Sequence, residues 1–451
     1  MDRLLIANRG EIAVRIIRAA RELGIESVLV ASEPDADSYA VSLADDVRVI
    51  GPAPAAKSYL DRQAVLAAAQ AAECDALHPG YGFLSENASF ARSVIDAGIT
   101  WVGPSPEAIE LMGNKSRARQ AARDAGVPTL PGSDGALAPG TNAVGVARAI
   151  GYPLVVKASA GGGGRGIRLV TEEADLLPTI DVARAEAQAA FGDASVYLEQ
   201  FVHRARHVEV QIIGDGERVI HLGDRDCSLQ RRQQKIIEEA PAPMLPDAVR
   251  DTIRTSSIEL GRASSYSGLG TIEFLYDPER EKASFIEMNT RLQVEHPVTE
   301  MVTGLDLVRE QILVAATGTL RLQQEDIAIR GHAFEFRLNA EDPSQGFMPS
   351  PGTLSRLDWP GGPGVRVDSG VVAGSAVAPF YDSLLAKLVV WDQSRPDAIE
   401  RSARALSEIR IEGVSTTLPL LSIVLRRPEV RDATHHSKFI ETTPDLLGAD
   451  A

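Results

Sequence analysis

The first 110 residues alternate between short apolar runs and segments with helical periodicity, and this alternation restricts the fold more than any other feature. The pattern predicts a buried strand over 3–7 and a second strand over 27–31. Between them, Ile12 and Ile16 fall on one face of a predicted helix, and a further strand at 100–103 closes the series. Strands that alternate with helices form parallel sheets, so we predict an α/β domain with a Rossmann-like fold.

The charge and composition exclude several classes of protein. The 451 residues include 46 basic and 62 acidic side chains, which gives a formal net charge of -16. An acidic chain without a basic tract repels phosphate, so nucleic acid is not an expected partner. No apolar run approaches the roughly 18–20 residues of a membrane helix, and the start lacks a secretion signal. We therefore expect a cytoplasmic protein, with no membrane partner, whose cysteines Cys74 and Cys227 stay reduced.

The rest of the chain has a different organisation. A helical stretch at 113–127 leads into turn-rich residues 131–135, where we expect a small domain to begin. Beyond residue 195 the strands lengthen, which favours a mainly antiparallel sheet. Proline and glycine at 341–364 predict loops around short strands, and an amphipathic segment at about 397–409 predicts a last helix before a polar tail.

A run of glycines, Gly161-Gly162-Gly163-Gly164-Arg165-Gly166, matches G-x-G-x-x-G by letter. Its flanks disfavour a Rossmann turn, because a β-type run at 167–170 follows where a helix is required. They disfavour a P-loop, because no Gly-Lys-Ser/Thr is present. We predict a hairpin whose backbone N–H groups fold over phosphates, with Lys157 as a nearby positive charge. The alternative is a surface hairpin without a ligand.

Two predicted strands, 271–276 and 284–289, bring acidic side chains together. Alternation places Glu287 and Asn289 on one face, and Glu273 can project onto that face from the neighbouring strand. Hard oxygen donors of this kind suit Mg²⁺ or Mn²⁺ held together with a nucleotide phosphate. The alternative is a set of ordinary solvated carboxylates.

The next segment, Thr290 to Pro297, reads as a strand with Arg291, Gln293 and Glu295 on one face. We expect Arg291 to bind a small oxyanion and Glu295 to accept a proton. A structural ladder of ion pairs is the alternative.

Six motifs together resemble one family. They are Asn8-Arg-Gly-Glu-Ile12, His78-Pro-Gly-Tyr-Gly-Phe-Leu-Ser-Glu-Asn87, the glycine run, Arg225-Asp-Cys-Ser228, Glu238-Glu-Ala-Pro-Ala-Pro243 and Glu287-Met-Asn-Thr-Arg-Leu-Gln-Val-Glu-His-Pro297. The chain resembles biotin carboxylase, the ATP-grasp subunit of biotin-dependent acyl-CoA carboxylases, from residue 3 to about 440. The resemblance implies a Rossmann-like N-terminal (pre-ATP-grasp) domain at 1–112. An ATP-grasp domain at 113–330, with a glycine-rich lid at about 131–203, and a biotin carboxylase C-terminal domain at 331–445 would follow.

The resemblance also implies a reaction. ATP phosphorylates bicarbonate to carboxyphosphate, which breaks down to CO₂ and phosphate; phosphate then deprotonates biotin N1′, which captures CO₂. ATP and Mg²⁺ (or Mn²⁺) would be required. No Ala-Met-Lys-Met motif is present, so biotin would arrive on a separate biotin carboxyl carrier protein, and a carboxyltransferase and a homodimer are further expected partners. The acyl-CoA, for which acetyl-CoA is the leading expectation, is chosen by the partner.

The family pattern assigns roles to individual residues. The nucleotide would contact Lys115, Lys157, Gly162, Gly163, Gly164, Glu199, Val202, His207, Gln230, Glu273, Leu275 and Glu287. The metal would bind Glu273, Glu287 and Asn289, and bicarbonate would bind Lys235, Arg291, Gln293 and the Val294 amide, with Glu295 as base. Biotin would lie against Tyr81, Gly82 and Arg337. The catalytic set would be Lys235, Arg291, Glu295 and Arg337. Two positions, Ala160 and Gln233, depart from the common family pattern.

Three other interpretations stay open at this stage. The chain could be an ATP-grasp ligase that carboxylates aminoimidazole ribonucleotide, a carbamoyl phosphate synthase half, or a catalytically silent scaffold that binds nucleotide. Arg337 and the segment from Arg291 to Glu295 favour biotin over the first two.

Overall fold

A computed structural model describes residues 1–138, 140–159 and 167–446. The N-terminal unit is built on a five-stranded parallel sheet with the order β3-β2-β1-β4-β5. Its elements are β1 (Arg3–Ile6), α1 (Gly10–Glu22), β2 (Glu26–Ala31), α2 (Tyr39–Leu43), β3 (Asp46–Val49), α3 (Arg62–Ala71), β4 (Ala76–His78), α4 (Ala88–Asp96), β5 (Thr100–Trp101) and α5 (Pro106–Gly113). The predicted Rossmann-like arrangement is confirmed.

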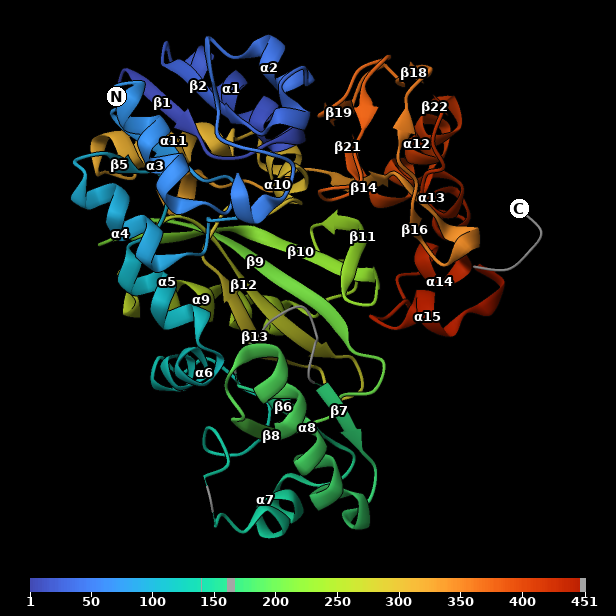
Figure 1. The fold of residues 1–451 in the computed structure, drawn as a ribbon. Coiled ribbons are helices and arrows are strands. Elements are labelled where there is room, and N and C mark those ends of the chain that lie inside the picture. Colours follow the sequence, from blue (N-terminus) through green and yellow to red (C-terminus); the bar gives the residue numbers. More distant parts are fainter. Residues whose placement is uncertain (139, 160–166, 447–451) are drawn as a thin grey trace.

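A small lobe follows helix α6 (Lys115–Asp124) and forms the lower part of the molecule (Figure 1). It consists of α7 (Ala143–Ile150), β6 (Leu154–Ala158), β7 (Ile167–Val170), α8 (Leu176–Phe191) and β8 (Val196–Gln200). Strands β6 and β7, which flank the glycine run in the sequence, pair antiparallel as a hairpin requires. Gly162, Gly163, Gly164 and Ala160 themselves lie outside the described residues.

An antiparallel sheet of eight strands, in the order β13-β12-β9-β10-β11-β14-β21-β19, forms the centre. Its first five strands are β9 (Arg206–Asp215), β10 (Val219–Arg231), β11 (Gln234–Ala240), β12 (Ser267–Asp277) and β13 (Lys282–Asn289). Three helices pack against these strands: α9 (Asp247–Ala263), α10 (His296–Thr303) and α11 (Leu307–Thr317). The sheet continues across residue 331, where sequence reasoning places a domain boundary.

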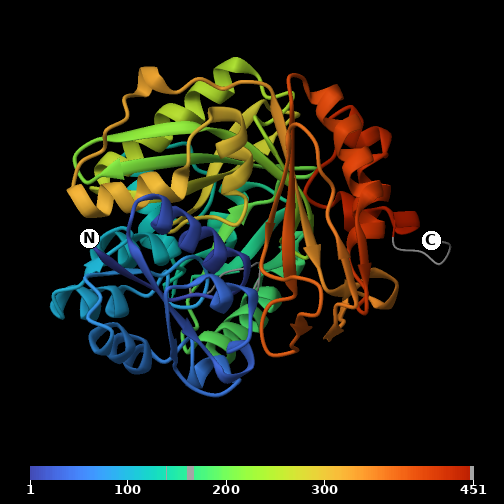
Figure 2. The same cartoon turned by 90° about the horizontal axis from the view of Figure 1, so that it is seen from above.

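The C-terminal unit contributes three strands to this sheet: β14 (His332–Asn339), β19 (Val365–Ser369) and β21 (Leu384–Asp392). The loops with short strands expected at 341–364 contain β15 (Glu341–Asp342), β16 (Met348–Pro349), β17 (Gly352–Thr353) and β18 (Arg356–Asp358). Strand β20 (Ala376–Val377) lies beyond that stretch and pairs with β17. Seen from above, this unit lies beside the N-terminal unit (Figure 2).

The helix predicted near 397–409 is confirmed, but the prediction that it is the last helix is wrong. Helix α12 (Arg395–Glu408) is present, but β22 (Arg410–Glu412), α13 (Leu418–Leu425), α14 (Pro428–Arg431) and α15 (Phe439–Thr442) follow it. Helix α13 has the sequence LPLLSIVL and packs into the core, so it lacks the alternating polar face that marks an amphipathic helix.

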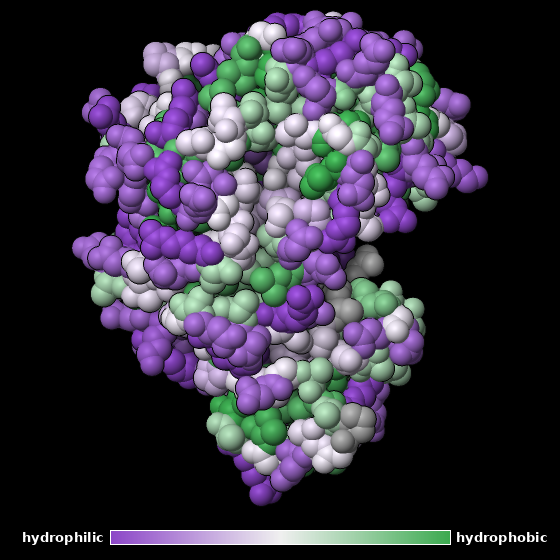
Figure 3. Space-filling model, turned by 90° about the vertical axis from the view of Figure 1, so that its left-hand side faces the viewer, coloured by the Kyte–Doolittle hydropathy of each residue, from purple (hydrophilic) through white to green (hydrophobic). Residues whose placement is uncertain are grey.

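Packing at the centre of the molecule holds the units together. Ile12 and Ile16 of α1 are buried in one apolar cluster with Leu307 and Ile312 of α11, and each such side chain stabilises the fold by roughly 2 kcal/mol. On the outer face shown in Figure 3, hydrophilic residues predominate and hydrophobic residues form scattered groups. Among the described residues, the helices lack the combination of length and apolar composition that a membrane span requires.

Candidate active site

Lys235 stands at the centre of a buried cluster of charges. Its Nζ lies 2.6 Å from Glu209 Oε2, 3.1 Å from Glu273 Oε1 and 2.5 Å from Glu295 Oε1. These partners come from β9, from β12 and from the residue that precedes α10. Burial would lower the pKa of the Lys235 ammonium, but the thiol of Cys227 and the three carboxylates outweigh that effect and raise it, so Lys235 is a cation.

A fully buried arginine, Arg225, binds one of the carboxylates of this cluster. The Arg225 guanidinium donates from Nε to Glu209 Oε1 at 2.6 Å and from Nη1 to Gln211 Oε1 at 2.7 Å. Sequence reasoning missed the participation of Glu209, Gln211 and Arg225. The signal was available for two of them, because Glu209 and Gln211 alternate with apolar residues along β9 and must share a face.

Two predicted metal ligands face each other across β12 and β13. Glu273 and Glu287 form a cross-strand pair, and Glu209 lies opposite Glu273 on the other side. Asn289 Nδ2 donates to Glu273 Oε1 at 2.8 Å, so the structure brings all three predicted ligands into one corner. His207 Nε2 lies 3.0 Å from Glu273 Oε2.

The donor set of this corner fits a divalent cation. Burial and repulsion from Glu273 raise the pKa of Glu287, whose nearest cation, Lys115, is 3.6 Å away. The pKa of Glu273 is lowered, because Lys235 and His207 outweigh the effect of burial. Two neighbouring carboxylates are hard oxygen ligands of the kind that magnesium and manganese prefer, and the Asn289 amide oxygen, which here accepts from Arg291 Nη2 at 3.1 Å, would complete the set.

The prediction that residues 290–297 form a strand is wrong. Strand β13 ends at Asn289, and helix α10 begins at His296 with Pro297 in its first turn, so the intervening segment is irregular. Arg291 donates from Nε to Glu86 Oε2 at 2.8 Å and from Nη1 to Gln293 Oε1 at 3.1 Å. Arg291, Gln293 and Glu295 therefore do not share one face of a strand. The segment turns, so that Arg291 binds Glu86 and Glu295 binds Lys235.

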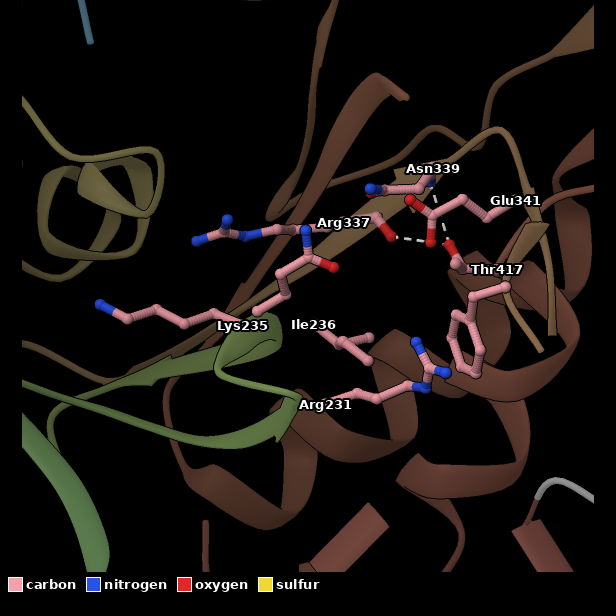
Figure 4. Close-up of a pocket in the computed structure, with 9 residues that line it drawn as sticks. Arg231, Lys235, Ile236, Arg337, Asn339, Glu341 and Thr417 are labelled. Carbon is pink, nitrogen blue, oxygen red and sulfur yellow. Dashed lines mark hydrogen bonds between the residues drawn. The ribbon is translucent and has the colours of Figure 1, made fainter. Parts of the chain in front are cut away.

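Arg337 approaches the cluster from β14. Its Nε donates to Glu238 Oε1 at 2.6 Å and its Nη2 donates to Glu295 Oε2 at 3.0 Å. Figure 4 shows the side chains of Lys235 and Arg337 pointing in the same direction from neighbouring strands. Burial raises the pKa of Glu295, but Lys235, Arg337 and Arg225 outweigh it, so that carboxylate is ionised.

A cavity of about 570 Å³ opens above Lys235 and Arg337, between the N-terminal and C-terminal units. Tyr81, Gly82 and Val294 line it with these two cations, so the residues predicted for biotin and part of those predicted for bicarbonate share one space. Its other walls are mixed: one part is apolar and includes Pro349, Pro351, Val377, Pro379, Phe380 and Leu384, and another part carries the charged residues Arg9, Glu11, Glu341 and Asp382.

The residues predicted to contact the nucleotide lie in several parts of the structure. In the small lobe, Lys157 of β6 forms an ion pair with Glu199 of β8, and Arg119 Nη1 lies 2.9 Å from the same carboxylate. Val202 and Leu275 pack together in one small apolar cluster. Gln230 lies opposite Lys235 in the β10–β11 pair, whereas Gln233 is exposed in the tight turn between these strands.

Comparisons with known proteins agree along the whole chain. The biotin carboxylase N-terminal domain matches residues 1–109, the ATP-binding domain of the carbamoyl-phosphate synthase L chain matches 114–323, and the biotin carboxylase C-terminal domain matches 335–442. Biotin carboxylase 1 of Bacillus subtilis is 48% identical over 450 residues, covering 100% of both chains. Biotin carboxylase of Pseudomonas aeruginosa is 50% identical over 428 residues, covering 94% of this chain and 95% of its own.

Solved structures give the same result. A biotin carboxylase–β-γ-ATP complex from Campylobacter jejuni superimposes with a TM-score of 0.93 at 45% identity, covering 98% of both chains. The biotin carboxylase domain dimer of Hydrogenobacter thermophilus 2-oxoglutarate carboxylase, in complex with MgADP, ADP and bicarbonate, gives 0.94 at 44% identity. That match covers 100% of this chain and 99% of the other.

Proposed function

The chain belongs to the biotin carboxylase family, and from this we propose how its residues divide the work of carboxylating biotin. It is an ATP-dependent ligase with ATP-grasp architecture. The observation that carries the assignment of roles is the convergence of Lys235, Glu295 and Arg337 at the floor of one cavity.

Bicarbonate would bind where Lys235, Arg291, Gln293 and the Val294 amide surround Glu295. In the present arrangement Glu295 accepts hydrogen bonds from both Lys235 and Arg337, and these cations keep its pKa low. A bound anion competes for these cations, so the pKa of Glu295 rises when bicarbonate enters. Glu295 can then take the bicarbonate proton, which leaves a carbonate oxygen free to attack the γ-phosphorus of ATP; the bond from that phosphorus to the bridging oxygen breaks, and ADP leaves.

Biotin would lie against Tyr81 and Gly82, with its ureido oxygen facing Arg337. Removal of the N1′ proton places negative charge on that oxygen. A guanidinium fixed by Glu238 and Glu295 stabilises this charge without having to reorganise.

The nucleotide would lie between the small lobe and the central sheet, in contact with Lys115, Lys157, Glu199, Val202 and His207. Gln230, Leu275 and the glycine run (Gly162, Gly163, Gly164) are the further proposed contacts. Glu273, Glu287 and Asn289 would hold Mg²⁺ or Mn²⁺, which neutralises phosphate charge when bound. Lys115 would balance the negative charge of Glu287, whose carboxylate lies 3.6 Å from its Nζ.

The expected partners follow from the family to which the chain belongs. The apolar part of the cavity wall, with Val377 and Phe380, suits the aliphatic chain by which biotin is attached to a carrier, so we assign carrier-bound biotin as the substrate. A biotin carboxyl carrier protein and a carboxyltransferase would complete an acyl-CoA carboxylase, with acetyl-CoA as the leading candidate substrate of the complex. The Hydrogenobacter domain dimer supports a homodimer, and we place the protein in the cytoplasm.

ATP turnover tests the proposal directly. We expect ADP formation to require bicarbonate and to rise when free biotin is added. Turnover that responds to aminoimidazole ribonucleotide instead of biotin would assign the chain to the other carboxyphosphate-using ligases. Nucleotide binding without any bicarbonate-dependent turnover would identify a silent scaffold.

A further inference from the structure

Lys387 is a charged side chain that the reaction described above does not use. It is one of only seven lysines in the chain, and its side chain is fully buried. It lies on β21, directly between Arg337 on β14 and Asp368 on β19. Because a buried ammonium is costly unless it is paired, its partners indicate what it does.

Lys387 belongs to the C-terminal unit, and its Nζ contacts one residue of the N-terminal unit and one residue of the central unit. It lies 3.0 Å from Glu11 Oε2 in α1 and donates to the Val294 carbonyl oxygen at 2.9 Å. Glu11 in turn accepts a hydrogen bond from the Tyr81 hydroxyl. Glu11, Tyr81 and Val294 all line the same cavity. Lys387 therefore contacts two lining residues, Glu11 and Val294, that belong to different parts of the cavity wall.

We propose that Lys387 is a positioning residue that fixes the bicarbonate segment relative to the biotin wall of the cavity. The inference rests on the function proposed above. The Val294 carbonyl belongs to the peptide that leads into Glu295, so the bond from Lys387 orients both the Val294 backbone and the proposed base. Through Glu11, the same ammonium orients Tyr81 on the other side.

The electrostatics support a permanent donor at this position. Burial opposes the charge, but Glu11, Glu335 and Asp368 outweigh it and raise the pKa of Lys387. The ammonium has three donors, and a contact with Glu11 uses one of them. The bond to the Val294 carbonyl directs another donor to the bicarbonate segment.

The double variant Lys387→Met/Glu11→Gln tests the proposal without leaving either charge buried alone. We expect the KM for bicarbonate and the KM for free biotin each to rise about tenfold, while the KM for ATP stays within about twofold. Glu11→Gln alone keeps the bond from Lys387 to Val294, so it should raise the biotin KM and leave the bicarbonate KM unchanged. Lys387→Arg keeps a charged donor and should recover part of the loss.

Several outcomes would overturn the proposal. One is a folded double variant, judged by its thermal unfolding, with an unchanged bicarbonate KM. Another is a parallel rise of all three KM values, which would indicate a general structural role. If the double variant fails to fold, Glu11→Gln decides: an equal rise in the bicarbonate and biotin KM values contradicts the assignment. A wild-type protein without bicarbonate-dependent ATP turnover would refute the proposed function instead.

Discussion

Arg337 and Arg231 allow the role of a single cation to be tested with a matched control. Both line the small pocket of Figure 4, but Arg337 reaches Glu238 and Glu295, whereas Arg231 lies 3.9 Å above the Phe347 ring. We expect Arg337→Ala to lower the kcat for biotin carboxylation by about 100- to 1000-fold, because the charge developing on the ureido oxygen loses its donor.

The same variant should still bind ATP, because Arg337 is not among the proposed nucleotide contacts. Arg231→Ala should retain near wild-type carboxylation. Both activities can be measured as carboxybiotin formation, and nucleotide binding as a calorimetric titration. Equal activity of Arg337→Ala and the wild type would show that Arg337 has been given the wrong role.

At the scale of elements, one buried carboxylate connects β11 to its neighbours. Glu239 of β11 accepts from Arg395 Nε of α12 at 2.6 Å and lies 2.7 Å from His332 Nε2 of β14. Burial opposes ionisation of Glu239, but Arg395 and His332 outweigh it and lower its pKa from 4.5 to about 2. The carboxylate is therefore more acidic in the folded protein than in the unfolded chain.

This shift makes stability depend on pH. A depressed pKa contributes stability above pH 4.5, and the contribution is lost as the pH falls towards 2. We expect Glu239→Gln to lower the free energy of unfolding by about 3 kcal/mol at pH 7, and the difference from wild type to fall to about half by pH 3. Urea unfolding at several pH values measures it.

An exposed acid on the neighbouring helix provides the control. Glu408 pairs with Arg404 on the surface of α12. Glu408→Gln should change the free energy of unfolding by less than about 1 kcal/mol at every pH. A gap between Glu239→Gln and the wild type that stays constant from pH 7 to pH 3 would contradict the assigned pKa.

At the scale of the whole molecule, a chain of ion pairs connects the three main units. Arg15 of α1 donates to Glu300 Oε1 of α10 at 2.8 Å, and Arg366 of β19 donates to Glu300 Oε2 at 2.6 Å. Arg366 also binds Asp368 through two nitrogens, at 2.9 and 2.7 Å. The Glu300 carboxylate of the central unit therefore binds one arginine from the N-terminal unit and one from the C-terminal unit.

Breaking this connection should destabilise the protein as a whole. Arg366→Met leaves Glu300 and Asp368 buried with less compensation, so we expect the free energy of unfolding to fall by about 3 kcal/mol. Arg356→Met removes an arginine of the same unit whose pairs with Asp358 and Glu412 are exposed, and it should cost less than about 1 kcal/mol. Chemical denaturation of both variants provides the comparison; similar losses would argue against the shared carboxylate as a connection between units.

Features that depend on neighbours along the chain could be predicted from the sequence. The alternation of apolar residues gave the parallel N-terminal sheet, and the turn between two nearby strands brought Glu273 opposite Glu287. Local periodicity reports which residues share a face, and a hairpin joins strands whose register is set by a short turn. The family motifs added expected roles for residues such as Arg337, which periodicity alone does not indicate.

Contacts between distant segments were decided by the tertiary structure alone. Lys235 meets Glu209 and Glu295 because β11, β9 and the start of α10 converge, and Lys387 reaches Glu11 and Val294 only because three units pack together. The segment after Asn289 turns instead of extending, and helix α10 begins at His296 with Pro297 in its first turn, a position that proline favours. Charge attraction does not depend on separation along the chain, so the partner of each buried charge is fixed by packing and not by the local pattern.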